Sequence, residues 1–183
     1  MVIMKATFNQ CGWLSEFFMK KIELSQQGKN KGKFFALVDD EDFEELDKYQ
    51  WMALRRRKDV YYAERLAHAS DNTAKIRVTM HGLLMNTPAG LCCDHKDGNG
   101  LNNQKSNLRI CTNSENVRNQ RLSILNRVGY KGVRASGKRY RARIAYNGEE
   151  INLGGFTDIK EAARAYDEAA RRLHGAFART NFE

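Results

Sequence analysis

The sequence has few of the residues and segments that mark several common classes of protein. It contains one proline and four cysteines in 183 residues. No two cysteines form a C-x-x-C pair, which argues against a zinc ribbon, and no apolar run approaches the roughly 18 residues of a membrane-spanning helix. The sequence also has no long low-complexity tract, so disorder is not expected. We therefore expect a folded chain without a membrane segment. We also expect reduced cysteines rather than disulfides; the four are Cys11, Cys92, Cys93 and Cys111.

Negative charge is absent from one long segment. The chain carries 31 Lys and Arg against 22 Asp and Glu, a net charge of +9, yet no acidic residue lies between Asn116 and Gly148. A focused basic field is typical of a protein with a polyanionic partner, although a solvated basic face is the alternative. The segment holds nine basic residues: Arg118, Arg121, Arg127, Lys131, Arg134, Lys138, Arg139, Arg141 and Arg143.

The first part of the chain has the pattern of a small sheet with short helices. Strand patterns occupy residues 22–24, 34–38 and 76–78, and two more strands are expected on either side of a turn at 56–59. The strand at 76–78 runs into a helical turn. An acidic helix is predicted in residues 39–49. Residues 1–18 fit poorly with the strand patterns after them, so we expect an N-terminal extension that does not belong to the folded part.

The stretch CDHKDGNGLNNQKSNLRICTNSENVRN, from Cys93 to Asn119, is crowded with amide side chains. It predicts a strand that ends in Asp94-His95, a long loop, a second strand at residues 108–111, and then a helix. Thr112 and Glu115 form a T-x-x-E capping box, which marks the start of that helix. This order of elements brings Asp94, His95 and Asn116 together if the helix lies across the two strands.

The residue types in this stretch favour metal-assisted hydrolysis. Asp94 and Asn116 offer one anionic and one neutral oxygen, which suits Mg²⁺ because that ion keeps several waters and takes few protein ligands. His95 can accept a proton from an attacking water, and the side-chain oxygen of Asn107 can fix its tautomer. A bland alternative is that Asp94 and His95 cap a turn and the asparagines form Asx-turns.

These residues resemble the pattern of the HNH, or His-Me finger, endonucleases, especially the phage and intron-encoded homing enzymes. Asn107 follows His95 by twelve positions within NLR, and Asn116 follows Asn107 by nine within ENVRN. The resemblance covers residues 22–120 and implies that His95 is the general base, that Asn107 orients it, and that Asp94 and Asn116 bind one Mg²⁺ or Mn²⁺. The zinc-binding C-x-x-C pairs of many HNH proteins are missing, so no structural zinc is expected.

The last part of the chain predicts a three-stranded antiparallel sheet followed by one helix. GYKGVRASGKRYRARIAYNGEEINLGGF alternates apolar and polar residues across turns at ASGK and NGEE, and Asn147-Gly148 is a strong hairpin signal. In the following helix, Thr157 is the expected N-cap. Its apolar residues recur at spacings of three, four and seven: Ile159, Ala162, Ala163, Tyr166, Ala169, Ala170 and Leu173.

This part resembles the AP2/ERF DNA-binding domain through YKGVR, YRARI, LGGF, EAARAYDEAARRLHG and the closing TNF. The resemblance implies that the sheet enters the major groove of duplex DNA and that the helix packs behind it. Since side chains alternate along a strand, Arg139, Arg141 and Arg143 should share one face. Glu150 and Asn152 stand where plant domains tend to carry Arg and Trp, which puts the plant target site in doubt.

Together these patterns predict an α+β chain, a ββα-metal nuclease domain followed by an AP2-type sheet packed on one helix. We expect an extension at 1–18, an HNH domain at 19–121, a basic linker at 122–128 and an AP2/ERF-like domain at 129–183. The expected protein is a monomeric, phage-encoded endonuclease of the bacterial cytoplasm that nicks double-stranded DNA. Its predicted DNA-binding residues are Arg118, Arg121, Arg127, Lys131, Arg134, Arg139, Arg141 and Arg143.

Two other functions fit the same sequence. The first is a non-catalytic, sequence-specific DNA-binding regulator in which the HNH half has become a scaffold. The intact set of Asp94, His95, Asn107 and Asn116 argues against it, because a scaffold has no need of these residues. The second is an RNA-directed nuclease, which the groove-sized basic sheet disfavours, because the major groove of A-form RNA is too narrow to admit it.

Overall fold

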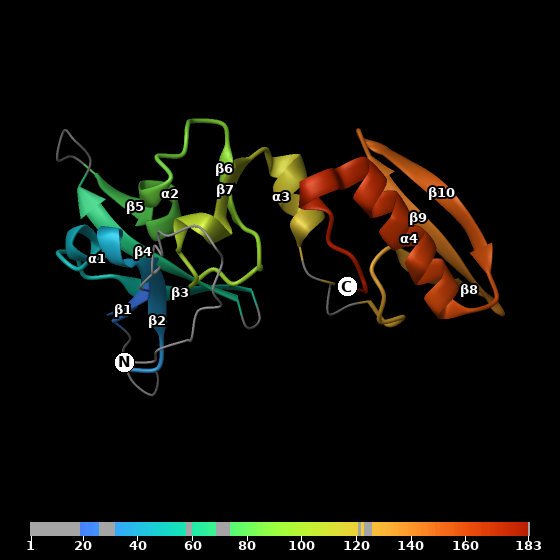
Figure 1. Ribbon diagram of the computed structural model, residues 1–183, viewed down its shortest axis with the longest axis horizontal. Coiled ribbons are helices and arrows are strands. Elements are labelled where there is room, and N and C mark those ends of the chain that lie inside the picture. The colour runs from blue at the N-terminus through green and yellow to red at the C-terminus, as the bar shows by residue number, and fades with distance from the viewer. Residues whose placement is uncertain are drawn as a thin grey trace, which may run out of the picture. The chain divides into compact units, whose positions relative to one another are not determined.

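The structure is a computed structural model that describes residues 19–25, 32–57, 60–68, 74–120, 122 and 126–182. The predicted extension at 1–18, residues 123–125 of the predicted linker and Arg121 lie outside the described residues. The described chain forms two compact units (Figure 1). One unit runs to Asn86 and also includes Asn99–Leu108; the other contains Thr87–Gly98 and the chain from Arg109 onward.

The first unit begins with an antiparallel hairpin and an acidic helix. Strand β1 (Met19–Glu23) pairs with β2 (Phe35–Asp39), and α1 (Asp40–Leu46) follows β2 directly. Asp40, Glu41 and Asp42 lie in the first turn of α1, where negative charge interacts favourably with the exposed N–H groups of the helix. The two strands and the acidic helix predicted from the sequence are therefore confirmed.

A second antiparallel sheet completes the first unit. Its strands β3 (Met52–Arg57), β4 (Val60–His68) and β5 (Lys75–Thr79) pair in chain order. Helix α2 (Met80–Leu84) follows, and the Thr79 side chain caps it by accepting from the Gly82 N–H. The core between these elements is fully buried and apolar, which drives their association; it contains Ile22, Leu24, Ala36, Val38, Leu46, Trp51, Ala53, Ala63 and Met80.

The amide-rich stretch folds into strand, loop, strand and helix, as predicted. Strands β6 (Cys92–His95) and β7 (Leu108–Cys111) form a two-stranded sheet, and the short 3₁₀ helix η2 (Lys105–Asn107) ends the loop between them. Helix α3 (Asn113–Asn119) begins with a complete capping box. The Glu115 N–H donates to the Thr112 hydroxyl, and the Glu115 carboxylate accepts from the Thr112 N–H, which satisfies two N–H groups that the helix itself leaves unpaired.

Three antiparallel strands and a long helix end the chain. The sheet has the order β10 (Glu149–Phe156), β9 (Arg139–Tyr146) and β8 (Val133–Ser136), with α4 (Ile159–His174) and the 3₁₀ helix η3 (Gly175–Phe177) after it. Figure 1 shows α4 lying along one face of this sheet. Small side chains let the helix approach closely, since Ala162, Ala163, Ala169 and Ala170 are all buried. No helix in the described part of the chain is long and apolar enough to cross a membrane.

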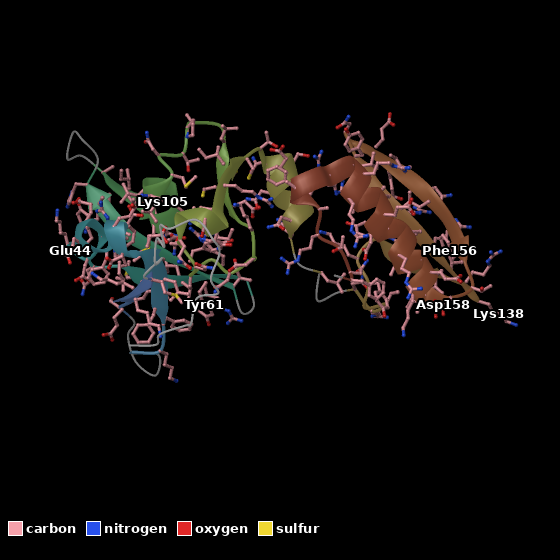
Figure 2. The ribbon with its side chains drawn as sticks, viewed as in Figure 1. Glu44, Tyr61, Lys105, Lys138, Phe156 and Asp158 are labelled. Carbon is pink, nitrogen blue, oxygen red and sulfur yellow. The ribbon has the colours of Figure 1, made fainter. Side chains whose placement is uncertain are left out.

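The N-cap of α4 is one residue later than predicted. Asp158, labelled in Figure 2, accepts from the Lys160 N–H at 2.7 Å and the Glu161 N–H at 3.0 Å. Thr157 therefore lies outside the helix, and its assignment as the N-cap was wrong. The physical reason is that a carboxylate can accept both bonds while its negative charge also favours the helix N-terminus.

Gly132 is the position where the last sheet and α4 come closest to a steric limit. Its φ is +75°, and a Cβ placed there would lie 1.9 Å from Cδ2 of the buried Tyr166 ring. We expect Gly132→Ala to lower the free energy of unfolding by about 3 kcal/mol, since the left-handed backbone costs roughly 1–2 kcal/mol and overpacking roughly 1–3. Urea unfolding followed by circular dichroism at 222 nm, where α4 is the longest described helix, measures this change.

Gly148 is the matched control for this substitution. Its φ is +85°, but no described atom beyond its chain neighbours lies within 4 Å of a Cβ built there. Gly148→Ala should therefore cost only the backbone term, about 1–2 kcal/mol. Equal losses for the two variants would contradict the close packing of Gly132 on Tyr166.

Candidate functional site

The loop that carries Asn107 is anchored by β2 and α1. The Leu37 N–H donates to the Leu101 carbonyl at 2.8 Å, and the Asn103 N–H donates to the Leu37 carbonyl at 2.7 Å. The Asp39 carboxylate, which makes no hydrogen bond to its own helix, accepts from the Lys105 N–H at 2.8 Å. These bonds fix the backbone immediately before Asn107.

A second set of contacts holds the same loop through charge. The Lys105 ammonium, labelled in Figure 2, lies 2.8 Å from Glu41 Oε1 and 2.7 Å from Asp42 Oδ1. Both carboxylates belong to α1, and hydrogen bonds to them raise the pKa of Lys105. The acidic helix predicted from the sequence thus has a structural role in the first unit, because it secures η2.

The Asn107 side chain has a defined orientation. Its Nδ2 donates to the Asn102 carbonyl at 2.8 Å. Since the nitrogen faces Asn102, the oxygen is the end of the amide that can accept a hydrogen bond from another group. This is the atom predicted from the sequence to orient His95. That role remains a prediction, because Asn107 and His95 belong to different units.

Asp94 is the buried acidic side chain of the amide-rich stretch. It lies near the end of β6 and is 6% exposed. Arg109, from the neighbouring strand β7, donates to its Oδ2 through Nε at 2.9 Å and through Nη2 at 2.7 Å. Asn119, at the end of α3, donates through Nδ2 to Oδ1 at 3.2 Å and to Oδ2 at 3.0 Å. Strand and helix therefore hold this carboxylate from two sides.

His95 follows Asp94 as the last residue of β6 and is 3% exposed. Its carbonyl accepts from the Gly98 N–H at 2.9 Å and from the Asn119 side chain at 3.0 Å. Asn119 thus binds the side chain of one candidate site residue and the backbone of the other. This double contact places the end of α3 against the end of β6, as a ββα site requires.

The structure brings Asn119, rather than Asn116, into hydrogen-bond contact with Asp94. Asn116 lies on the first turn of α3 and is half-buried. Among the described residues, Arg109 and Asn119 are the side-chain partners of Asp94. Neither was assigned a role at this site from the sequence. The available signal for Asn119 was its position about one helical turn after Asn116, which puts both on a similar face.

The donor set around Asp94 suits a hard cation that has few protein ligands. No three His, Cys, Asp or Glu side chains gather within the part of the chain that the structure describes. A site built on Asp94 and the Asn116 amide offers only oxygen, and Mg²⁺ or Mn²⁺ accepts such a set together with waters and phosphate oxygens. The residues present therefore fit a divalent cation of this class.

The nearby cysteines do not provide a softer site. Burial raises the pKa of Cys93 and of Cys111 to about 11. Both are thiols at neutral pH, whereas thiolates are the form that binds zinc. Cys92 Sγ instead donates to Asn113 Oδ1. The three described cysteines are all free.

The exposed face of the last sheet carries arginines on two neighbouring strands. Along β9, Arg139 and Arg141 are exposed, while Ala142 and Ile144 are buried against α4, so the predicted alternation is confirmed. Arg134 on β8 lies directly opposite Arg141 in the register. The two side chains make no ion pair or side-chain hydrogen bond with any other described residue, so they are available to a ligand.

The remaining predicted DNA-binding residues are placed less favourably. Arg143 forms an ion pair with Glu150 on β10, and Arg139 donates to the Gly155 carbonyl. Arg118 lies over the Tyr146 ring, 5.6 Å from its centroid. Arg127 is exposed. The ammonium of Lys131 donates to the carbonyls of Arg118 and Gln120, so its hydrogen bonds are directed into the protein.

Lys131 should give the chain a distinctive pH dependence. Burial, helped by the charge of Arg179, lowers the pKa of Lys131 from 10.5 to about 8. Between these values the unfolded chain binds the additional proton, so the free energy of unfolding should rise with pH. The rise should be absent in Lys131→Met. Urea unfolding of both proteins at pH 7.5 and 9.5 tests this, and parallel changes in the two would contradict it.

A family model and a viral relative point to the same family. The family model described as HNH endonuclease matches residues 86–118. An uncharacterized HNH endonuclease of Acanthamoeba polyphaga mimivirus is 30% identical over 84% of this chain and 78% of its own length. Protein 3.8 of Escherichia phage T7 is 35% identical over 50% of this chain and 77% of its own.

A third relative resembles only part of this chain. An ethylene-responsive transcription factor of Medicago truncatula is 45% identical over 44% of this chain, and the match spans 32% of that protein. The mimivirus relative, in contrast, matches most of both chains, and the family model covers the segment that holds β6, β7 and most of α3. On these grounds the chain belongs to the HNH endonuclease family.

Proposed function

We propose that this protein is a divalent-metal-dependent DNA endonuclease with His95 as its general base. The observation that carries the proposal is the pair Asp94-His95 at the end of β6. Asn119 holds it by bonding both the Asp94 carboxylate and the His95 carbonyl. A catalytic group must be held close to its productive geometry, and this arrangement fixes the Asp94 carboxylate and the backbone of His95.

His95 acts as the proton acceptor in this proposal. A ring nitrogen takes a proton from the water that attacks the phosphorus, which imidazole can do near neutral pH. The Asn107 oxygen accepts the hydrogen on the other ring nitrogen and thereby fixes the tautomer. The bond from Asn107 Nδ2 to the Asn102 carbonyl at 2.8 Å supports this role, because it fixes the orientation of the amide.

Asp94 and Asn116 would hold the cation. When bound, a divalent cation supplies positive charge that stabilises the leaving oxygen of the phosphodiester. Asp94 contributes the charged oxygen ligand and Asn116 a neutral one. Cleavage with this polarity leaves a 5′-phosphate and a 3′-hydroxyl. A single site of this kind cuts one strand, so a monomer would nick double-stranded DNA.

The last sheet is proposed to place the nuclease on DNA. Its exposed face carries Arg134 and Arg141 side by side, and two arginines can grip phosphates or read guanines in a major groove. The partial similarity to a protein named as a transcription factor supports an AP2/ERF-like domain at 129–183. We retain the HNH domain at 19–121 and the basic linker at 122–128 as the other parts.

The two viral relatives support an origin in a virus or phage. For a phage protein of this kind, the site of action would be the DNA in the bacterial cytoplasm. The alternative of a non-catalytic regulator has one observation in its favour. Asp94 is neutralised by Arg109 at 2.7 Å, which is an arrangement that a purely structural carboxylate would also make.

The test is conversion of supercoiled plasmid to open circles by the intact chain with Mg²⁺ and with EDTA. The nuclease proposal predicts open circles only with Mg²⁺, and DNA ligase should reseal them because the ends are a 5′-phosphate and a 3′-hydroxyl. If the chain binds the plasmid and leaves it supercoiled with Mg²⁺ and with Mn²⁺, the regulator replaces the nuclease.

A further inference from the structure

Arg109 neutralises the one carboxylate of the candidate metal site. Two of its nitrogens donate to Oδ2 of Asp94, at 2.9 and 2.7 Å. The two side chains are 14% and 7% exposed, so water screens their attraction only weakly. Paired in this way, Asp94 and Arg109 together carry no net charge.

Arg109 is held in this position by further contacts in the same unit. Its Nη1 donates to the Ala176 carbonyl, and its guanidinium lies 3.9 Å from the centroid of the Phe177 ring. Cations are attracted to the face of an aromatic ring. These contacts keep the positive charge beside Asp94, since they bind parts of the guanidinium that Asp94 does not use.

The two oxygens of Asp94 differ in their surroundings. Oδ2 accepts from both Arg109 and Asn119, whereas Oδ1 accepts only from Asn119 at 3.2 Å among the described residues. A carboxylate oxygen has lone pairs for more than one partner. Oδ1 is therefore the oxygen that can face a cation while Oδ2 stays with the arginine.

The charged side chains that line the cavity next to this carboxylate are all basic. A cavity of about 450 Å³ next to the site is lined by Lys96, Arg109, Asn119, Arg179 and Thr180, among others. A divalent cation entering here meets a carboxylate paired with Arg109, neutral amides and the basic side chains of Lys96 and Arg179. Coulomb repulsion opposes its binding, and the same charges attract a phosphate.

We propose that Arg109 makes the candidate site take up its divalent cation together with a DNA phosphate rather than before it. The phosphate supplies the negative charge and the oxygen ligands that Asp94, paired with Arg109, cannot supply alone. Arg109 is thus a positioning residue that couples metal binding to DNA binding. This inference rests on the proposed function, because it takes Asp94 as a metal ligand.

Mn²⁺ binding tests the coupling without relying on cleavage. The protein is the full chain with His95→Ala, which should leave the DNA intact, and the free-Mn²⁺ signal in electron paramagnetic resonance reports binding. Titrations are run with and without a 30-base-pair duplex of mixed sequence. Because the duplex itself binds Mn²⁺, the same titration with the Asp94→Asn, His95→Ala double variant gives the background that is subtracted. We expect at least about tenfold tighter binding with DNA.

The contribution of Arg109 is tested with a matched pair of substitutions in the same background. Arg109→Gln removes the charge but keeps a hydrogen-bonding side chain, and Arg109→Lys keeps the charge. Without DNA, Arg109→Gln should bind Mn²⁺ at least about tenfold more tightly than the parent, whereas Arg109→Lys should stay close to it. A residue that only supports the fold would give weaker binding, not tighter, when its charge is removed.

The outcomes separate this inference from the proposed function. If the parent binds Mn²⁺ equally well with and without DNA, and Asp94→Asn abolishes both, the metal site stands and the coupling is wrong. If no arm binds Mn²⁺ in a way that depends on Asp94, the metal site itself fails, and the inference fails with it. The comparison of the parent with and without DNA decides the coupling even if Arg109→Gln does not fold.

Discussion

His95→Ala should lower the rate of DNA nicking by about 10²- to 10⁴-fold, the usual contribution of a general base. The reason is that no other proposed site residue can accept the proton of the attacking water at neutral pH: Asn107 and Asn116 are neutral amides, and Asp94 is held by Arg109 and Asn119. The measurement is the initial rate of open-circle formation from supercoiled plasmid with Mg²⁺, at protein concentrations that saturate the DNA.

Two controls make this result specific. DNA affinity of His95→Ala should stay within about twofold of the parent, because His95 is 3% exposed and a buried side chain makes few of the phosphate contacts that dominate DNA affinity. His68→Ala changes an exposed histidine at the end of β4 and should leave the rate unchanged. Equal rates for the parent and His95→Ala would remove His95 from the mechanism.

Replacing both Arg134 and Arg141 by alanine should weaken DNA binding by about 30- to 10⁴-fold at moderate salt, since each arginine contact is worth roughly 1–3 kcal/mol. The two side chains are adjacent on the exposed face of β8 and β9. If they contact phosphates, the slope of log affinity against log salt should also fall by about two. Fluorescence anisotropy with a labelled duplex at several salt concentrations measures both quantities.

A charge-matched variant controls for the loss of two positive charges. Lys160 and Arg172 are exposed on α4, the helix that packs on the other face of this sheet. Lys160→Ala with Arg172→Ala removes the same net charge and should leave both affinity and salt slope nearly unchanged. If the two double variants lose affinity equally, the sheet face is not the DNA-binding surface and net charge alone explains binding.

The parts of the fold that follow local rules could be predicted from the sequence. The T-x-x-E box at Thr112 located the start of α3, because its two hydrogen bonds join residues three apart. The Asn147-Gly148 pair located the turn between β9 and β10, where both residues have positive φ. The apolar stripe of α4 identified its buried face, because helical periodicity can be recognised from residues three and four apart in the sequence.

The features that were missed depend on residues far apart in the sequence. Arg109 meets Asp94 because β7 pairs with β6, and Asn119 meets it because α3 folds back onto that pair. The pairing of Arg143 with Glu150 likewise depends on the register of β9 and β10. The metal-ligand role of Asn116, which the HNH resemblance implied, stays a prediction. No local pattern shows that Asn119, about one helical turn later, bonds Asp94.

The measurement that tests the central claim most directly is plasmid nicking by the intact chain and by Asp94→Asn across a series of Mg²⁺ concentrations. We predict ligatable nicks from the intact chain, none with EDTA, and a rate at least about 100-fold lower for Asp94→Asn. Loss of a residue that binds the metal directly should lower activity more than loss of a residue that only hydrogen-bonds to a metal ligand, which typically lowers metal affinity or activity about 10- to 100-fold. Nicking that persists in EDTA, or that survives unchanged in Asp94→Asn, would contradict a metal-dependent nuclease site at the end of β6.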